Sequence, residues 1–433
     1  MSKMIINGSG AGGTGSDECT ARLSDIPAGL KAVTADSNDE AGVGTMTMTG
    51  NAQAAHVLAG ETFYTNNYKT KLIGTMTVNS LLSFSVAAYS GRRVLAKWQN
   101  PNQAAGKPFS GVIIRYSTSG YPGTTGGTQI YKGAGNNTAA GAWSQAYLDM
   151  PSLNTTYYFS CYPYVTIGEG EINGVVRNVT CKTSGELNKT FTASGSYTIP
   201  AGYTKMDLFA VGGGSAGLHG FSRTIGSGGG GGGYTKTVAN ISVTAGQSLS
   251  VIIGSGGSGV VGGPRRGGAS YVNRASERLI TANGGEDSSN SISVGMRGGS
   301  GGGAGGSGDR YNINGAAGGS NGSAGDSISG GSSGGSGQGT TTRAWGSGTM
   351  YSGGGGGGGY YYGASYQGVA GAGGSGGGGA GGSAGQAGTG GRSGQAGTGG
   401  GGGGAGSYYL SSESGNTNLG GNGGSGVVLM KLY

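Results

Sequence analysis

Few residues of this sequence have the type and spacing that chemistry at an active site requires. The two histidines, His56 and His219, lie in no recognisable nucleophile or metal-ligand spacing, and His219 is expected to be an ordinary loop residue. The segment GSGGSG at residues 254–259 matches a phosphate-binding glycine pattern, but no Gly-Lys-Ser/Thr accompanies it and glycine is abundant throughout. We therefore predict that the chain is not an enzyme and uses no cofactor or metal ion.

The cysteines and the N-terminal residues indicate in which cellular compartment the protein is made. Cys19, Cys161 and Cys181 cannot all pair within one chain, and their spacing matches no zinc pattern. The start, MSKMIINGSGAGG, has no apolar run long enough for a signal peptide, and no segment reaches the roughly 18 apolar residues of a membrane helix. We expect synthesis in a cytoplasm, no membrane insertion and three buried, reduced thiols.

The residues best suited to recognition lie in short aromatic inserts between glycine runs. Tyr and Trp offer a large contact area at low entropic cost, and Gly and Ser keep a loop adaptable. Alternatively, the same rings cap the edges of the glycine-rich structure, and for the tyrosine cluster YYYGASY both roles are open. The candidate binding residues are Phe221, Arg223, Asp309, Arg310, Tyr311, Arg343, Trp345, Tyr351, Tyr360, Tyr361, Tyr362, Tyr366, Tyr408 and Tyr409.

The composition argues against a nucleic-acid partner. Glycine supplies 109 of the 433 residues, and charged residues make up only 10%. The net charge of +8 is carried by single or paired arginines, whereas a nucleic-acid groove needs a concentrated basic stripe. Arg-Gly-Gly occurs only at Arg266 and Arg297, which disfavours a disordered RNA-binding segment.

The spacing of the glycines indicates an ordered helix with three residues per turn. Between residues 373 and 406 every third residue is glycine, and the heptamer GQAGTGG recurs at Gly385 and Gly394, a spacing that keeps its faces in phase. Collagen has the same period but relies on proline, and only 8 prolines occur, none after Pro264. Polyglycine II helices, which hydrogen-bond laterally to their neighbours, are therefore predicted.

The cost of ordering glycine predicts where each kind of run lies. Fixing one residue costs about 1–2 kcal/mol of backbone entropy, and most for glycine, so a lone polyglycine II helix would not be stable. A helix surrounded by others tolerates only hydrogen as a side chain. We expect the pure runs 228–233 and 353–359 inside the array and the GQAGTGG segments outside.

Strand-like segments bracket this interior and complete an all-β, multidomain fold. FTASGSYTIPAGYTKMDLFAVGGGSAG, which opens at Phe191, and GGNGGSGVVLMKLY, which closes the chain, alternate apolar and polar residues and are predicted to share one sheet. RASER, between SYVN and LITANGG, is predicted to form a hairpin tip with a solvated charged face. The predicted domains are residues 1–78, 79–183 and 184–433.

The second predicted domain is a run of strands separated by Gly, Pro and Asn turns, which is typical of a β-sandwich. RRVLAKWQNP, SGVIIRYSTS, TTYYFSCYPYV and GVVRNVTCKT are its main strands, and alternation places Tyr157 and Tyr162 on opposite faces of the third. The domain resembles a fibronectin type III module, with Trp98 as the core tryptophan and Tyr157 as the tyrosine-corner residue. Such modules are usually spacers, with sugar binding by Tyr121, Tyr162 or Tyr164 as the alternative.

The first predicted domain contains an internal repeat. One unit ends in Gly-Thr-Met at Met46 and the next at Met76, thirty residues later, and each contains an Ala-Gly turn. Units this small cannot bury a core alone, so they must stack on each other or on identical chains. They resemble the small "VLAGKT…GTM" repeats of tail-fibre proteins from phages and prophages of gut bacteria.

A second resemblance covers residues 191–433. The opening strand, the aromatic inserts between glycine runs and the GSGVV terminal strand are similar to the glycine-rich domain of phage tail proteins. More distantly, they resemble the adhesin at the distal tip of long tail fibres in T-even-like phages. The resemblance implies a receptor-binding tail-fibre or tail-tip protein of a phage, prophage or phage-like bacteriocin, located in the virion.

The same resemblance implies the partners. The aromatic loops would bind a bacterial surface receptor, protein or glycan, and the first domain would attach to other tail or baseplate proteins. A homo-oligomer is implied, with a trimer favoured because it is the usual state of fibres, although tip adhesins can be monomeric. The alternative function is a structural, fibril-forming or matrix protein that self-assembles through open lattice or strand edges.

Overall fold

A computed structural model shows an all-β protein with several separate sheets, as the sequence predicts. Among the described residues the helical segments are short 3₁₀ turns: η1 (Ser16–Glu18), η2 (Leu23–Asp25), η3 (Ala54–His56) and η4 (Ala344–Gly346). None of the helices in this part of the chain is long and apolar enough to cross a membrane. The structure describes residues 15–167, 170–220, 225–263, 265–287, 292–308, 311–329, 332–408 and 418–433.

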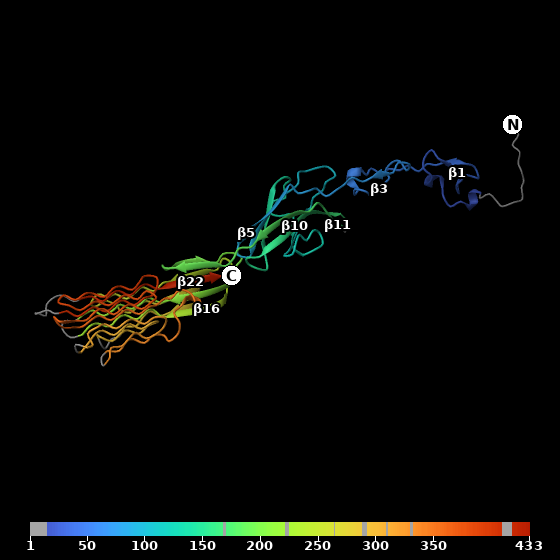
Figure 1. The fold of residues 1–433 in the computed structure, drawn as a ribbon. Helices are drawn as coiled ribbons and strands as arrows, with labels where there is room; N and C mark the ends of the chain where they lie inside the picture. The colour runs from blue at the N-terminus through green and yellow to red at the C-terminus, as the bar shows by residue number, and fades with distance from the viewer. Residues whose placement is uncertain are drawn as a thin grey trace, which may run out of the picture. The chain divides into compact units, whose positions relative to one another are not determined.

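The chain divides into two compact units. The first holds the repeats and a β-sandwich, and the second holds the glycine-rich region (Figure 1). The first unit comprises Met1–Ala87, Val94–Leu148 and Thr156–Lys182, and the second comprises Ala88–Arg93, Asp149–Thr155 and Thr183–Tyr433.

Each N-terminal repeat folds as a small hairpin closed by its Gly-Thr-Met segment. The first contains β1 (Lys31–Ala32) and β2 (Gly42–Val43), and the second contains β3 (Thr62–Phe63) and β4 (Leu72–Ile73). In both, the methionine pairs in parallel with the residue before the Ala-Gly turn, as Pro27 with Met46 and Leu58 with Met76. No hydrophobic side chain is buried among the described residues before Leu81, so the repeats have no core of their own.

The β-sandwich contains the four predicted main strands, as β6, β7, β10 and β12. Trp98 is fully buried, as predicted for a core tryptophan, and Tyr157 is 2% exposed. One sheet has the order β5 (Ser83–Ser90), β6 (Arg93–Gln99), β9 (Trp143–Asp149). The other has the order β11 (Gly170–Asn173), β10 (Thr156–Ile167), β7 (Gly111–Ser117), β8 (Thr128–Gly133), and β12 (Arg177–Lys182) also pairs with β10.

The outer face of β10 is covered by a loop, which corrects one predicted alternative. Tyr162 is 2% exposed, and its hydroxyl donates a hydrogen bond to the Thr124 carbonyl at 3.1 Å. The Gly123 N–H donates to Ser160 Oγ at 3.0 Å, so the same loop also covers Ser160. Tyr162 therefore presents no ring to a sugar, whereas Tyr121, in the covering loop, is half exposed.

Two sheets form the base of the glycine-rich unit, and the closing strand of the chain lies inside the first of them. β22 pairs with the opening strand β13 on one side and with β15 on the other, as the bracketing pattern predicts. β18 and β19 form the predicted RASER hairpin, with Ala275 and Ser276 at its turn. The first sheet has the order β13 (Leu187–Phe191), β22 (Val427–Leu432), β15 (Lys205–Val211), β16 (Thr235–Ser242), and the second has the order β14 (Gly195–Thr198), β17 (Ser248–Ile252), β18 (Ser270–Arg274), β19 (Glu277–Ala282).

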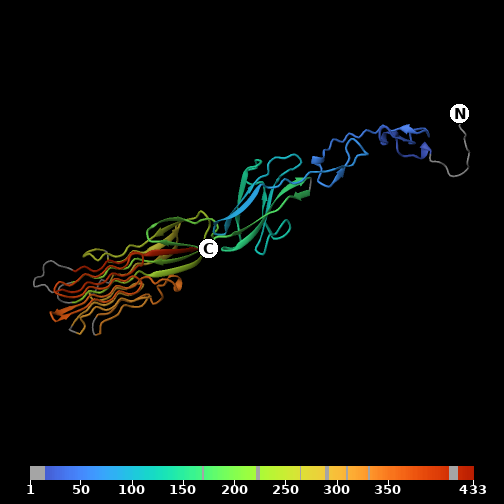
Figure 2. The same ribbon diagram turned by 45° about the horizontal axis from the view of Figure 1, so that its top comes forward.

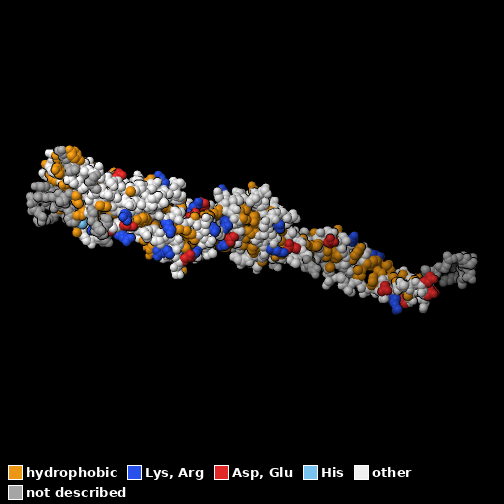
Figure 3. Space-filling view, turned by 90° about the horizontal axis from the view of Figure 1, so that it is seen from below, with side chains coloured by type: hydrophobic (Ala, Val, Ile, Leu, Met, Phe, Trp, Pro, Cys, Tyr) orange, Lys and Arg blue, Asp and Glu red, His pale blue; other side chains and the backbone are white. Residues whose placement is uncertain are grey.

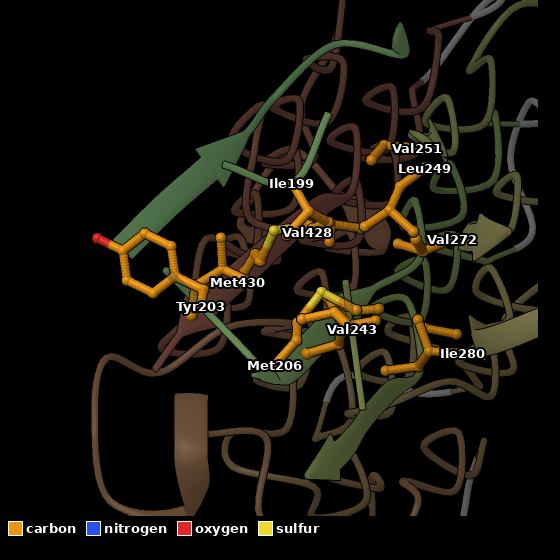
Figure 4. Close-up of a cluster of buried hydrophobic side chains, with 14 residues drawn as sticks. Ile199, Tyr203, Met206, Val243, Leu249, Val251, Val272, Ile280, Val428 and Met430 are labelled. Atoms are coloured by element: carbon orange, nitrogen blue, oxygen red, sulfur yellow. The ribbon is translucent and has the colours of Figure 1, made fainter. Parts of the chain in front are cut away.

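The hydrophobic core of this unit lies between the two sheets (Figure 4). Alternation along β22 sends Val428, Met430 and Leu432 into this core, and the second sheet contributes side chains such as Leu249 and Val272. Each large apolar side chain buried here stabilises the fold by about 1.5–3 kcal/mol. The core therefore fixes the sheets from which the glycine helices begin.

The glycine runs continue from these sheets and lie side by side as extended helices (Figures 1 and 2). Their backbone hydrogen bonds return to the same neighbour every three residues, which is the period of polyglycine II. The predicted packed helices are thus present. For example, the N–H groups of Gly226, Gly229 and Gly232 donate to the carbonyls of Gly306, Gly303 and Ser300 at 2.6, 2.9 and 2.8 Å.

The run 353–359 is an inner helix with neighbours on every side. All seven of its glycines are buried, as are those of 228–233, which confirms the predicted inner positions. A Cβ added at any of the seven would overlap a backbone carbonyl of an adjacent helix. Its N–H groups donate to residues in 376–382, 316–319 and 227–230, and its carbonyls accept from residues in 303–306, 371–374 and 401–407.

The two GQAGTGG segments lie on the outside, as predicted, but they contain reversals of the chain. Each heptamer spans a bend or turn, at residues 386–387 and 396–399, and its fourth residue, a glycine, has positive φ, +57° at Gly388 and +74° at Gly397. The segments joined by these turns run antiparallel to one another. The Arg392 N–H donates to the Ala380 carbonyl, and the Gly403 N–H donates to the Arg392 carbonyl. The frame of glycine at every third residue therefore continues through the turns, and the repeat does not mark one continuous helix.

Candidate functional site

The ends of the glycine helices farthest from the two sheets form one surface, which we call the loop end. An antiparallel bridge joins Ile225 to Ser307, and the Gly220 N–H donates to the Asn418 carbonyl at 2.8 Å. The neighbouring hairpins and turns therefore meet at this end. Its described residues are 218–220, 225–226, 306–308, 311–313, 360–368, 384–390, 406–408 and 418–419.

The main aromatic feature of the loop end is the hairpin of β20 (Tyr361–Gly363) and β21 (Tyr366–Gln367). It connects the inner helix 353–359 to the helix that follows it. Tyr362 is 50% exposed and Tyr366 is 42% exposed, and their rings meet edge to face with centroids 6.1 Å apart. The rings of Tyr360 and Tyr362 meet edge to face with centroids 6.3 Å apart, and Tyr360 is half-buried, which raises the pKa of its hydroxyl.

Two tyrosines predicted as binding candidates are buried instead. Tyr361 is 8% exposed and Tyr408 is 5% exposed, because alternation along the hairpin turns Tyr361 toward the lattice. The Tyr361 N–H donates to Ser407 Oγ at 2.7 Å, which ties the hairpin to the neighbouring helix. The burial of these two rings favours the capping interpretation for them.

The other predicted inserts are only partly described. Tyr311, from DRYNIN, is at the loop end and is 76% exposed. The remaining candidates of these inserts lie outside the described residues: Phe221, Arg223, Asp309, Arg310 and Tyr409.

The insert RAWGSGTMY lies at the opposite end of the bundle, beside the first sheet. Phe209 of β15 contacts the ring of Trp345, with centroids 6.1 Å apart, and the ring of Tyr351, at 5.5 Å. Arg343 Nη1 donates to the Gly348 carbonyl within the insert, at 3.1 Å. These three predicted candidates, Arg343, Trp345 and Tyr351, therefore close the outer face of the sheet and do not share a surface with Tyr362.

The described residues named above for the loop end include no Asp, Glu, Lys or Arg, and their polar groups are phenols, amides, hydroxyls and backbone. His219 is 9% exposed, and burial, together with the nearby Arg265, lowers the pKa of its imidazole, so the ring is neutral at pH 7. No group of three or more His, Cys, Asp or Glu side chains suited to a metal ion occurs among the described residues of the chain.

Ser407 is a supporting residue of the site that sequence reasoning missed. It is fully buried, its N–H donates to the Gly359 carbonyl at 2.9 Å, and its hydroxyl holds the tyrosine hairpin. The available signal was a serine that directly follows the run 399–406, which consists of glycine and alanine alone. A buried hydroxyl is retained there because it accepts the Tyr361 N–H.

The comparisons with known proteins agree with this architecture. No curated protein matches the chain. Residues 188–433, more than half of the chain, match the model of a family described as "Glycine-rich domain", and they include both sheets and all of the glycine helices described above. The chain therefore belongs to this glycine-rich domain family.

Proposed function

We propose that the protein is a non-enzymatic tail-fibre or tail-tip adhesin of a phage, prophage or phage-like bacteriocin, which binds a receptor on the bacterial surface. The observation that carries the proposal is the exposure of Tyr362 and Tyr366 on a hairpin anchored to the lattice. Exposed aromatic rings held on a rigid support are typical of binding hot spots, because little entropy is lost on binding.

The shape of the scaffold supports this role. At the loop end the hairpin of β20 and β21 and the bend at residues 386–387 connect glycine helices, so a lattice of fixed helices presents several connecting segments on one surface. Figure 3 shows hydrophobic side chains gathered at this end of the bundle. Function carried by loops on a rigid framework is the general pattern for binding proteins.

The remaining domains receive supporting roles in this proposal. The sandwich, which resembles a fibronectin type III module, acts as a spacer. The N-terminal repeats attach to other tail or baseplate proteins and associate with identical chains, a trimer being favoured. Exposed apolar residues in repeats that have no core of their own, such as Val43 and Ile73, fit such association.

A cell-binding assay tests the proposal. Fluorescently labelled full-length protein is incubated with a panel of enteric bacteria, and binding is measured by flow cytometry. The double variant Tyr362→Ser/Tyr366→Ser should lose at least about tenfold of the wild-type affinity for each strain bound, because it removes the two exposed rings of the hairpin.

The matched control is Tyr64→Ser/Tyr121→Ser, which removes two tyrosines of similar exposure, 50% each, outside the glycine-rich unit. It should bind as the wild type does. Equal loss in both double variants, or full binding by the loop-end variant, would contradict the proposed site. A folded wild-type protein that binds no strain of the panel would count against the adhesin function itself.

A further inference from the structure

The three-stranded sheet of the sandwich carries an exposed hollow that is separate from the loop end. The hollow has a volume of about 490 Å³ and lies on the outer faces of β6 and β9, with β5 beside them. This volume is in the usual range for small-ligand sites. Its lining residues are Ser85, Lys97, Asn136, Trp143, Ser144 and Gln145.

Strand alternation explains why Trp143, Gln145 and Lys97 point outward. In β9, Trp143 and Gln145 alternate with Ser144 and Leu148, which are 1% and 4% exposed and face the sandwich interior. In β6, Lys97 likewise lies between buried neighbours on the inner face. The hollow is therefore built on two paired strands.

The hollow combines an open aromatic ring with hydrogen-bond donors. Trp143 is 51% exposed, which leaves much of its indole uncovered. Asn136 Oδ1 accepts a hydrogen bond from the Gln145 N–H at 2.8 Å, so the amide is oriented with its NH₂ group as the remaining donor. Within the described residues, no ion pair engages the Lys97 ammonium, and the hollow has no carboxylate.

We propose that this hollow binds an acidic saccharide, with the sugar ring stacked on Trp143 and a carboxylate or other anionic substituent held by Lys97 and Asn136. The apolar C–H face of a pyranose matches the indole face. The ammonium and the amide supply donors to an anion. The inference does not depend on the proposed function, because all of the lining residues belong to the sandwich.

The lining is unlike that of a protein–protein interface. Cores of such interfaces are depleted in Lys and Ser, and stable ones bury about 800 Å² on each partner. Here one lysine and two serines surround a single tryptophan. Single-stranded nucleic acid needs successive rings along a basic groove, and this hollow has one cation.

Calorimetric titration of the full-length protein tests the proposal, with trigalacturonate as the acidic probe and maltotriose as the neutral one. Wild-type protein should bind trigalacturonate at least about tenfold more tightly than maltotriose at low salt. Trp143→Ala should weaken trigalacturonate binding at least about tenfold. Lys97→Gln should abolish the preference for the acidic probe.

The control is Tyr121→Ala, since Tyr121 matches Trp143 in exposure, at 50% against 51%, but lies in the loop that covers the other sheet. It should bind trigalacturonate as the wild type does, and so should Tyr362→Ser/Tyr366→Ser. The proposal is overturned if folded wild-type protein does not bind trigalacturonate, if it binds maltotriose equally well, or if Tyr121→Ala weakens binding as much as Trp143→Ala. Because Lys97→Gln keeps the tryptophan, it provides a second test if Trp143→Ala fails to fold.

Discussion

At the scale of single residues, the loop-end tyrosines differ in what their rings contact. Tyr361 and Tyr408 are buried against the lattice, whereas Tyr362 and Tyr366 keep about half of their surface exposed. Neighbouring residues of one short hairpin thus have different roles. Burial of Tyr361 and Tyr408 favours capping for this pair, and receptor contact is proposed for the exposed pair.

The cysteines also differ from one another, although the sequence predicts three buried thiols. All three are free, but only Cys161 is buried, and Cys19 and Cys181 are partly exposed. Burial raises the pKa of Cys161 far above its ordinary value, and it raises the pKa of Cys181 as well. Cys181 lies opposite the buried Tyr157, and Cys19 follows the short turn η1 outside any strand, so strand alternation does not show how well either thiol is covered.

Thiol alkylation measures this difference. With iodoacetamide at pH 8, Cys161 should react at least about tenfold more slowly than Cys19 in the native protein, because the thiolate is the reactive form and Cys161 is inaccessible. Peptide mass spectrometry gives the rate at each cysteine, and the unfolded chain in urea is the control, in which all three should react alike. Similar native rates at Cys161 and Cys19 would show that β10 is not buried.

At the scale of elements, the inner polyglycine helix is specified by sterics and hydrogen bonding together. Six neighbouring segments form hydrogen bonds with its N–H and C=O groups, and each position has room only for a hydrogen atom as side chain. This is why the runs 228–233 and 353–359 could be predicted as inner helices from composition alone. Lateral bonds offset the entropy that a lone glycine chain would lose on ordering.

Substitution within this helix should be far more costly than substitution at its margin. Gly356→Ala places a methyl group against the carbonyls of Gly371 and Ala372, and should lower the free energy of unfolding by about 1–3 kcal/mol or more. Gly385→Ala is the matched control. The Cβ added there would come closest to Gln367 Oε1, at 3.4 Å, which is the end of a flexible side chain. Urea unfolding compares the two, and equal stability would contradict the close packing of the inner helix.

The path of the chain through the lattice was harder to predict than its packing. The glycine period continues unchanged through the GQAGTGG turns, so periodicity does not show where the chain reverses. Successive glycine helices run in opposite directions, so the loops between them lie alternately at the sheet end and at the loop end of the bundle. The end at which an insert lies therefore depends on how many chain reversals precede it. RAWGSGTMY and YYYGASY are similar in composition, yet the first packs on Phe209 at the sheets and the second lies at the loop end.

At the scale of the whole molecule, stability is expected to differ between regions. The glycine-rich unit has a hydrophobic core between two sheets and a lattice fixed to it, and the sandwich has its own core around Trp98. The N-terminal repeats have neither among their described residues. The account rests on the claim that glycine runs, usually a sign of flexibility, are here the rigid support of a recognition surface.

Hydrogen–deuterium exchange on the full-length protein tests this claim most directly. Amides of residues 226–233 and 353–359 should exchange at least about a thousandfold more slowly than in a free peptide, which corresponds to ~4 kcal/mol of protection. Amides at the exposed bend 386–387 should exchange rapidly and serve as the internal control. Exchange of the two inner runs at free-peptide rates would contradict the lattice and, with it, the rigid display of the tyrosine hairpin.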